Sequence, residues 1–132
     1  MISTKGRYAV RVLIDLAEHK DDGYIPLRDV AGRQEISKKY LEIIMSDLVR
    51  ADMVKGISGK HGGYQLNRSP EDYNIFEILN VMEGTMATVA CLRDDAEPCS
   101  RESFCKTLPL WKELDEITRE FLSSKTLADL VG

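Results

Sequence analysis

The sequence predicts a mostly α-helical fold with one small β-hairpin, and three observations lead to this prediction. Residues 37–51 carry apolar side chains at i, i+3, i+4 and i+7, the spacing of a helix with one buried face. Two short β-like runs, 53–57 and 64–66, follow this stretch and are separated by a glycine-rich segment. Residues 108–124 return to helical spacing. A capped helix followed by a hairpin is the plan of a winged helix-turn-helix, here with a long C-terminal helix after it.

The segment before the hairpin contains the other helices of the predicted helix-turn-helix. Thr4 is expected to cap a first helix that ends before Asp21, and a short second helix is expected over 26–34. Ser37 is a suitable N-cap for the third helix, because its hydroxyl can accept a hydrogen bond from a free amide of the first turn. A helix, a short helix, a tight turn and a longer helix in this order make a helix-turn-helix. The residues expected to face the core from the first and third helices are Ala9, Val12, Leu13, Leu16, Ala17, Leu41, Ile44, Met45 and Leu48.

Two cations occupy the first turn of the first predicted helix, where the helix dipole disfavours positive charge. They are Lys5 and Arg7. The unfavourable interaction of these two cations with the helix dipole predicts a nearby anion, for which a DNA phosphate is one candidate. Two solvated charges at a fraying helix end are the alternative.

The chain after the hairpin is expected to form a fourth helix and then an irregular segment. Asn74 begins the helix with Glu77 as its capping-box partner, and Gly84 ends it. Residues 85–107 have no regular pattern and hold all three cysteines. A connection of this length without secondary structure is uncommon in a compact domain and is usually functional or disordered.

The C-terminal helix has a wide apolar face, which predicts a dimer surface. Packing of this face against its own domain is the alternative. The chain is therefore expected to have three parts within one compact domain: a DNA-binding part at 1–84, a cysteine loop at 85–107, and a dimerisation part at 108–132 that ends in a short helix. The residues of the predicted dimer face are Leu110, Trp111, Leu114, Ile117 and Phe121.

Composition and charge exclude several classes of protein. The net charge of −4 argues against a general nucleic-acid coat, but residues 1–68 carry +3 and residues 69–132 carry −7. This asymmetry favours a protein that meets phosphate with one side only. No apolar run is long enough to span a bilayer, and the N-terminus lacks the apolar segment of a secretory signal. A cytoplasmic protein without a membrane partner is expected. No catalytic motif and no small-molecule substrate site are found, so an enzyme is not expected.

The third predicted helix and the hairpin carry the candidate DNA-binding residues. The exposed first half of such a helix enters the major groove, where side chains meet base edges. Glu42 could accept a hydrogen bond from a cytosine amino group, or could pair with a lysine one turn before it. Ile43 could meet a thymine methyl, or could lie at the edge of the core. The remaining candidates are Ser37, Lys38 and Lys39 on the helix, with Gly59, Lys60, His61, Gly62 and Gly63 in the wing.

The cysteines Cys91, Cys99 and Cys105 are spaced C-x7-C-x5-C. Thiolates in one short segment can converge on a metal centre. Zinc sites more often contain closely spaced cysteine pairs, which are absent here. Iron–sulfur clusters use cysteine ligands, normally four, so one position is left for another ligand. Redox-active or inert buried thiols are the alternatives.

Together these segments resemble the bacterial iron–sulfur cluster regulators (IscR-type), a family of repressors with NsrR and CymR as relatives. The similar segments are ISTKGRYAV, ISKKYLEIIMSDLVRADMVK, GGYQL, the end of the fourth helix, the cysteine loop, and LWKELDE…FLSSKTLADLV. The resemblance implies a homodimeric transcriptional repressor on a near-palindromic double-stranded operator. It implies that Cys91, Cys99 and Cys105 hold an iron–sulfur cluster, 2Fe–2S in preference to 4Fe–4S. It also places Tyr40 on the DNA-reading helix and Ser58 at the start of the wing.

Three departures from the family pattern leave the sensing function open. The first cysteine gap is x7 where x5 is usual, Leu108 stands where the family has a histidine ligand, and Ser58 stands where a wing arginine is common. The fourth ligand is therefore open among Asp94, Asp95, Glu97, Glu102 and the partner subunit. Two other functions remain: a metal-free repressor of cysteine or sulfur metabolism that responds to thiol oxidation or a partner, and a winged-helix interaction module without a DNA role.

Overall fold

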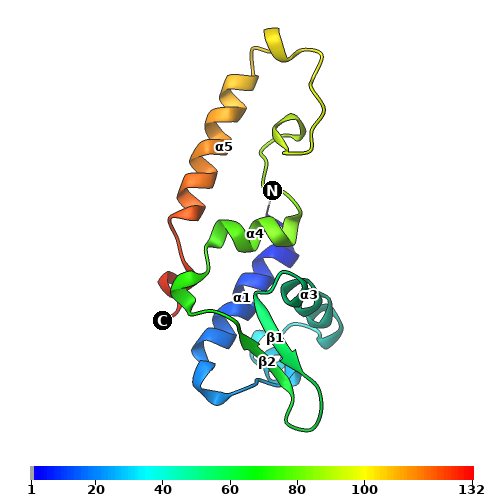
Figure 1. The fold of residues 1–132 in the computed structure, drawn as a ribbon, viewed down its shortest axis with the longest axis vertical. Helices are drawn as coiled ribbons and strands as arrows, with labels where there is room; N and C mark the ends of the chain where they lie inside the picture. The colour runs from blue at the N-terminus through cyan, green and yellow to red at the C-terminus, as the bar shows by residue number, and fades with distance from the viewer. Residues whose placement is uncertain (1) are drawn as a thin grey trace.

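The computed structural model describes residues 2–132 as a helical body from which one long helix and a loop extend (Figure 1). This is the predicted fold class, a mostly helical winged helix-turn-helix followed by a long C-terminal helix. Short 3-10 helices occupy several connections, including Ala90–Leu92 (η3) and Glu102–Phe104 (η4) within the cysteine loop. The α-helices are α1 (Thr4–Glu18), α2 (Leu27–Gln34), α3 (Lys38–Arg50), α4 (Ile75–Glu83) and α5 (Leu108–Ser123), and the strands are β1 (Val54–Ile57) and β2 (Gly63–Leu66).

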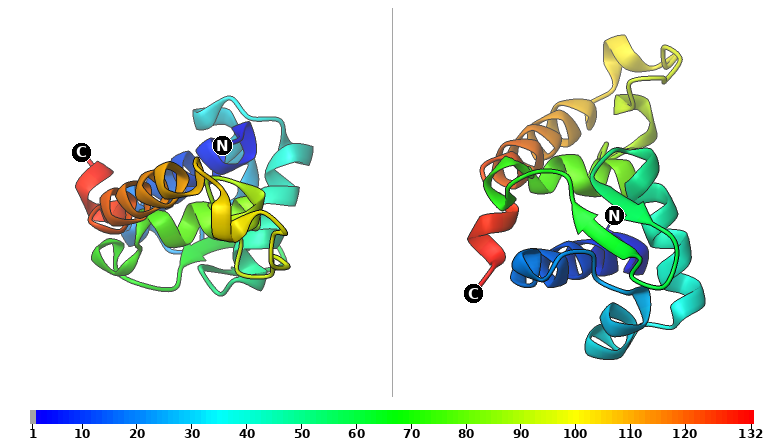
Figure 2. Two further views of the ribbon diagram at one scale, coloured as in Figure 1. Left: turned by 90° about the horizontal axis from the view of Figure 1, so that it is seen from above. Right: turned by 60° about the horizontal axis from the view of Figure 1, so that its bottom comes forward.

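The core lies where α1 packs against α2, α3 and α4 (Figure 2). The apolar positions predicted from the helical spacing of α1 and α3 are all buried, with exposed fractions from 0% to 4%. Burial of such side chains is the main favourable contribution to folding. The body therefore fixes the positions of α2 and α3, which form the helix-turn-helix. The part described contains no helix long and apolar enough to cross a membrane.

The N-terminus of α1 differs from the prediction by one residue. Ser3, not Thr4, is the N-cap, and its hydroxyl accepts a hydrogen bond from the Gly6 amide (3.1 Å). The physical reason lies in α4, whose Glu83 carboxylate accepts hydrogen bonds from both the amide (2.9 Å) and the hydroxyl (2.6 Å) of Ser3. This contact spans eighty residues of sequence, so local pattern alone does not predict it.

The ends of α4 and of the chain are capped in different ways. Asn74 accepts from the Glu77 amide at 3.2 Å, as predicted. The predicted capping box is not formed, because the Glu77 carboxylate pairs with Arg68 at 3.2 Å. Thr126 and Asp129 do form the reciprocal box, at the start of the short 3-10 helix Leu127–Leu130 (η5).

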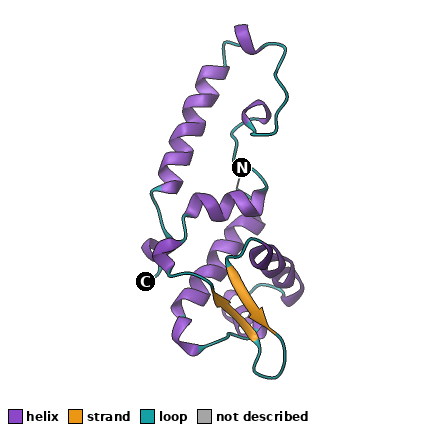
Figure 3. Cartoon of the chain, viewed as in Figure 1, coloured by secondary structure: helices purple, strands orange, loops and turns teal. Residues whose placement is uncertain are grey.

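The hairpin is a two-stranded antiparallel sheet (Figure 3). In its register Val54 is opposite Leu66 and Ile57 is opposite Gly63. An isolated two-stranded hairpin is marginally stable in water. Here the segment before α2 adds a bridge, since the Ile25 and Tyr64 backbones exchange two hydrogen bonds of 2.8 Å. A Cβ at Gly63 would lie 2.3 Å from the Ile25 carbonyl oxygen, so a residue without a side chain is required at this junction.

The cysteine loop is fastened at its beginning to both α4 and α5. The Met86 amide donates to the Asn80 side chain of α4 at 3.1 Å. The Thr88 amide and hydroxyl both donate to the Asp115 carboxylate of α5, at 2.8 and 3.1 Å. The tip of this loop and the tip of the hairpin lie at opposite ends of the molecule (Figure 1).

Candidate nucleic-acid interface and cysteine pocket

Helix α3 presents its polar residues to solvent, because its apolar stripe is fully buried against the body. The helix begins at the predicted cap, where the Ser37 hydroxyl accepts from the Tyr40 amide at 3.2 Å. Tyr40 itself is half-buried, with its ring edge-on to Tyr8 at a centroid distance of 5.9 Å. The other candidate residues of this helix are all exposed: Ser37, Lys38, Lys39, Glu42 and Ile43.

A groove of about 660 Å³ separates α3 from the wing. Lys38 and Glu42 line it on the α3 side, and Ser58, Gly59 and Gly62 line it on the wing side. The structure thus brings Lys38 and Glu42 together with part of the wing. Lys39 and Ile43 line a separate hollow on α3, which also contacts Glu42.

The same groove contains one cation that the sequence interpretation missed. Arg28 of α2 lines it with a side chain that is 78% exposed. The helical position of Arg28, one residue after the start of α2, was the available signal. Its partner in the structure is the neighbouring Asp29, at 3.9 Å, and such an exposed pair is weak.

Glu42 is the one acidic candidate on this surface. Within residues 2–132 its carboxylate forms no ion pair, so the alternative pairing with a lysine of its own helix is not seen. An unpaired exposed carboxylate repels phosphate but is free to accept a hydrogen bond from a base. The base-reading role of Glu42 stays a prediction.

The wing tip is basic and tightly turned. Lys60 and His61 are both exposed there. Gly59 has a φ of 106°, a conformation that favours glycine, and its carbonyl accepts from the Gly62 amide at 3.0 Å. The two exposed side chains stand between Gly59 and Gly62, which both line the groove.

The anion expected near the first turn of α1 is a carboxylate of the protein. Lys5 forms an ion pair with Asp47 of α3, which also pairs with Arg50 at 3.1 Å. The hydrogen bond from Lys5 lowers the pKa of Asp47. The suggestion that a DNA phosphate neutralises Lys5 is therefore corrected, while Arg7 remains exposed with a hydrogen bond to Thr4.

A buried carboxylate fixes α2 against α1. Asp15 is 2% exposed and accepts two hydrogen bonds from Arg33 (2.8 and 3.0 Å) and one from Gln34 (2.9 Å). Burial acts to raise the pKa of Asp15, but the hydrogen bonds from Arg33 and Gln34 outweigh it and lower the pKa. Because α2 leads directly into α3, this clamp helps to orient the helix-turn-helix.

The three cysteines line one cavity of about 220 Å³ at the N-terminal end of α5. Cys91 and Cys99 are exposed, Cys105 is half-buried, and all three are free thiols. Part of the remaining wall is apolar, formed by residues such as Leu92 and Leu108. The loop therefore gathers residues fourteen positions apart in the sequence around one small space.

Cys105 has an environment that favours its thiolate. Its sulfur lies 3.4 Å from the Thr107 hydroxyl, just before the first turn of α5. The hydrogen bond from Thr107, with further donors in the Thr107 and Leu108 amides, lowers the pKa of the Cys105 thiol.

Thiolates are suitable ligands for an iron–sulfur cluster, but the three cysteines do not form a preorganised metal site in this structure. In the part of the chain that the structure describes, no three His, Cys, Asp or Glu side chains converge closely enough to hold a metal ion. Of the acidic residues in the loop, Glu97 and Glu102 line the cavity, whereas Asp95 pairs with Arg93 at 3.2 Å. Leu108, which stands at the position of the family's histidine, is buried in the cavity wall.

Four of the five predicted dimer residues form an exposed apolar stripe along α5. Leu110, Leu114, Ile117 and Phe121 are 43% to 59% exposed. Trp111 is half-buried and so differs from the other four. The alternative, that this stripe packs against its own domain, does not hold for these four residues.

Comparison with known proteins agrees with this architecture over the whole chain. The model of a family described as Rrf2, iron-dependent transcriptional regulator, matches residues 2–132. The chain is 38% identical over 131 residues to the HTH-type transcriptional regulator CymR of Bacillus subtilis, covering 99% of this chain and 89% of CymR. It is 35% identical over 131 residues to the HTH-type transcriptional regulator IscR of Yersinia pestis, covering 99% of this chain and 79% of IscR.

Solved structures give the same result. The structure of CymR, the global cysteine regulator of B. subtilis, superposes with a TM-score of 0.78 at 37% identity, covering 98% of this chain and 95% of that one. The structure of T. potens IscR gives a TM-score of 0.77 at 34% identity, covering 98% and 85%. These relatives are named as transcriptional regulators and not as enzymes. The chain belongs to the Rrf2 family of winged-helix, DNA-binding transcriptional regulators.

Proposed function

We propose that this protein is a homodimeric repressor whose operator binding responds to an iron–sulfur cluster held by Cys91, Cys99 and Cys105. The observation that carries the proposal is that all three thiols line one cavity at the N-terminal end of α5. Thiolates are the usual ligands of such clusters, and the resemblance to IscR-type regulators favours 2Fe–2S over 4Fe–4S. When bound, the cluster supplies a centre whose oxidation state and integrity depend on iron, oxygen or nitric oxide.

In this proposal the three parts of the chain divide the work, and the protein acts on cytoplasmic DNA. Residues 1–84 bind a near-palindromic operator through α3 and the wing, residues 85–107 sense, and residues 108–132 dimerise. The exposed stripe on α5 supports the dimer, because an uncovered row of large apolar side chains is unfavourable in water. A two-fold dimer would place two recognition helices on successive half-sites.

The fourth ligand in this proposal is Glu97 or Glu102. Both residues line the cysteine cavity, unlike Asp94 and Asp95. A residue of the partner subunit is the remaining candidate. Glu97→Gln and Glu102→Gln variants distinguish these cases, since loss of the true ligand alters the absorption spectrum and the iron content.

Anaerobic purification tests the cofactor. The protein is expected to be brown and to contain iron and acid-labile sulfide, and Cys→Ser variants at the three positions are expected to lose both. A colourless protein that takes up no iron and sulfide on anaerobic reconstitution would overturn the proposal. Operator affinity is then compared with and without the cluster at one fixed salt concentration.

A second candidate is a metal-free repressor of cysteine or sulfur metabolism that responds to thiol oxidation or to a partner protein. The lowered pKa of Cys105 supports it, as does the similarity to CymR, named as a global cysteine regulator. It predicts full operator binding by metal-free protein and release on oxidation of the thiols alone. The third possibility, an interaction module without a DNA role, is disfavoured by the DNA-binding relatives.

A further inference from the structure

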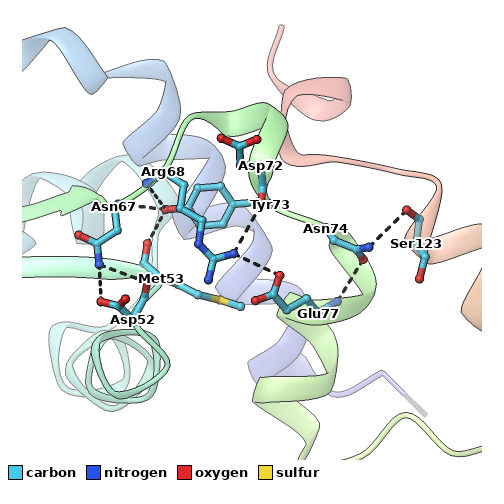
Figure 4. Close-up of polar contacts among 9 residues, drawn as sticks. All are labelled: Asp52, Met53, Asn67, Arg68, Asp72, Tyr73, Asn74, Glu77 and Ser123. Atoms are coloured by element: carbon cyan, nitrogen blue, oxygen red, sulfur yellow. Dashed lines mark hydrogen bonds and ion pairs between the residues drawn. The ribbon is translucent and has the colours of Figure 1, made fainter.

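The hydroxyl of Tyr73 joins the two ends of the β-hairpin (Figure 4). Tyr73 follows the 3-10 helix Pro70–Asp72 (η2) and is fully buried. Its hydroxyl donates to the carbonyl of Met53, the residue before β1, and accepts from the amides of Asn67 (3.1 Å) and Arg68 (3.2 Å), the residues after β2. A phenol has one donor and two acceptor positions, so its capacity is fully used.

The backbone beside Tyr73 is held by the segment that ends α5. The Tyr73 carbonyl accepts from the Leu127 amide at 2.9 Å, and the Ile75 amide donates to the Lys125 carbonyl at 3.1 Å. The Asn74 side chain donates to the Ser123 carbonyl of α5 at 3.4 Å. Residues 73–75 therefore connect the end of the proposed dimer helix to the base of the wing.

Arg68 and Asn67 fix this connection in place. The Arg68 guanidinium lies 5.1 Å from the centroid of the Tyr73 ring and pairs with Glu77 of α4 at 3.2 Å. The Asn67 side chain donates to the carbonyl and the carboxylate of Asp52, at 3.2 and 3.0 Å. Asp52 has a φ of 59°, so the contact also secures the left-handed turn between α3 and β1. The wing and the end of α5 thus meet at Tyr73, and the turn after α3 is joined to them through Asn67.

We propose that Tyr73 is a positioning residue for operator binding, which sets the wing relative to the dimer helix. This inference rests on the proposed function, in which α5 forms the dimer and the wing contacts DNA. In a two-fold dimer, the distance between the two DNA half-sites has to match the distance between the DNA-contacting elements of the two subunits, here α3 and the wing. The hairpin is marginal by itself, and the Ile25–Tyr64 bridge ties it only to the segment before α2. The hydrogen bonds that join both ends of the hairpin to the residues held by the end of α5 are those of the Tyr73 hydroxyl, beside the contact of Arg68 with the Tyr73 ring.

Tyr73→Phe tests this role, because it removes the hydroxyl and keeps the buried ring under Arg68. Operator affinity is expected to fall by about tenfold, because the three hydrogen bonds that orient the wing are lost together. Tyr24→Phe is the matched control, since in residues 2–132 no hydrogen bond to the Tyr24 hydroxyl is formed. Its affinity is expected to equal that of the wild type.

Two further measurements separate positioning from general stability. Amide hydrogen exchange in the free protein is expected to become faster over 54–66 in Tyr73→Phe and to stay unchanged over 38–50. In a double-mutant cycle with Lys60→Ala, the two losses of operator affinity are expected to overlap, so that the double variant loses less than the product of the single losses. Faster exchange across the whole chain, fully multiplicative losses, or unchanged operator affinity would each overturn the inference.

Lys60→Ala also distinguishes failure of the inference from failure of the proposed function. If Lys60→Ala weakens binding and reduces the salt slope by about one while Tyr73→Phe has no effect, only the role of Tyr73 is refuted. If Lys60→Ala has no effect on any sequence, the wing contact itself is refuted, and the Tyr73 inference falls with it.

Discussion

Replacement of Ile117 by aspartate should separate the proposed dimer into monomers. Ile117 is 57% exposed in the single chain, so the substitution should not unfold the monomer. Complete burial of an isoleucine contributes about 1.5–3 kcal/mol, so covering its exposed half contributes about 1–1.5 kcal/mol per copy. A two-fold interface contains the residue twice, which doubles the loss to about 2–3 kcal/mol.

The introduced carboxylate adds to this loss. A charge taken out of water without a partner costs several kcal/mol even after relaxation. The combined effect of at least about 5 kcal/mol corresponds to a dimer Kd raised by roughly 4,000-fold or more. Operator binding that depends on two linked half-sites should weaken in parallel.

Sedimentation equilibrium over a wide concentration series measures this change directly. Glu116→Gln is the matched control: it changes the charge by one unit on the same helix, about 100° away from Ile117. Thermal unfolding followed by circular dichroism checks that the monomer remains folded. If Ile117→Asp has the dimer Kd of the wild type, the assignment of the exposed α5 stripe to dimerisation is wrong.

Two further predictions concern α3 and its support. Glu42→Ala is expected to lose about 1–3 kcal/mol of discrimination between operator variants, because its carboxylate is free to accept from a base; equal changes in affinity for all sequences in a competition assay would refute this role. Asp15→Asn is expected to reduce the free energy of unfolding at neutral pH by about 3 kcal/mol, the lower end for a broken buried ion pair, since Arg33 can reach water. Because folding lowers the pKa of Asp15, its stabilising contribution is present above the unfolded value near 3.8 and is lost as the pH falls through the folded value. Urea titrations at a series of pH values should therefore show a wild-type loss in acid that Asp15→Asn lacks, and identical acid profiles would contradict this reasoning.

Features with a local cause were predictable from the sequence. The buried stripe of α3 follows from its spacing, because side chains at i, i+3, i+4 and i+7 share one helix face whatever they pack against. Ser37 was identifiable as a cap because it bonds to an amide only three residues away. The apolar stripe on α5 was predictable in the same way, from the helical spacing of its side chains.

Predictions failed where a distant residue competed for a local role. Ser3 caps α1 because its hydroxyl is hydrogen-bonded to Glu83 of α4. The predicted capping box at Glu77 does not form because the Glu77 carboxylate pairs with Arg68 instead. Lys5 finds its anion in Asp47, on another helix. The sequence shows which residue types are present, but it does not show which distant residues pair with one another.

The sequence by itself determined the fold class, the family and the presence of three thiols in one short segment, since periodicity, motif and spacing are properties of neighbouring residues. Only the tertiary structure decided that these thiols line one cavity and that Arg28 lines the same groove as α3 and the wing. It also decided that Tyr73 connects the wing to the end of α5. The physical reason is that each of these arrangements depends on side chains far apart in the chain, whose contacts are fixed by the packing of the whole body.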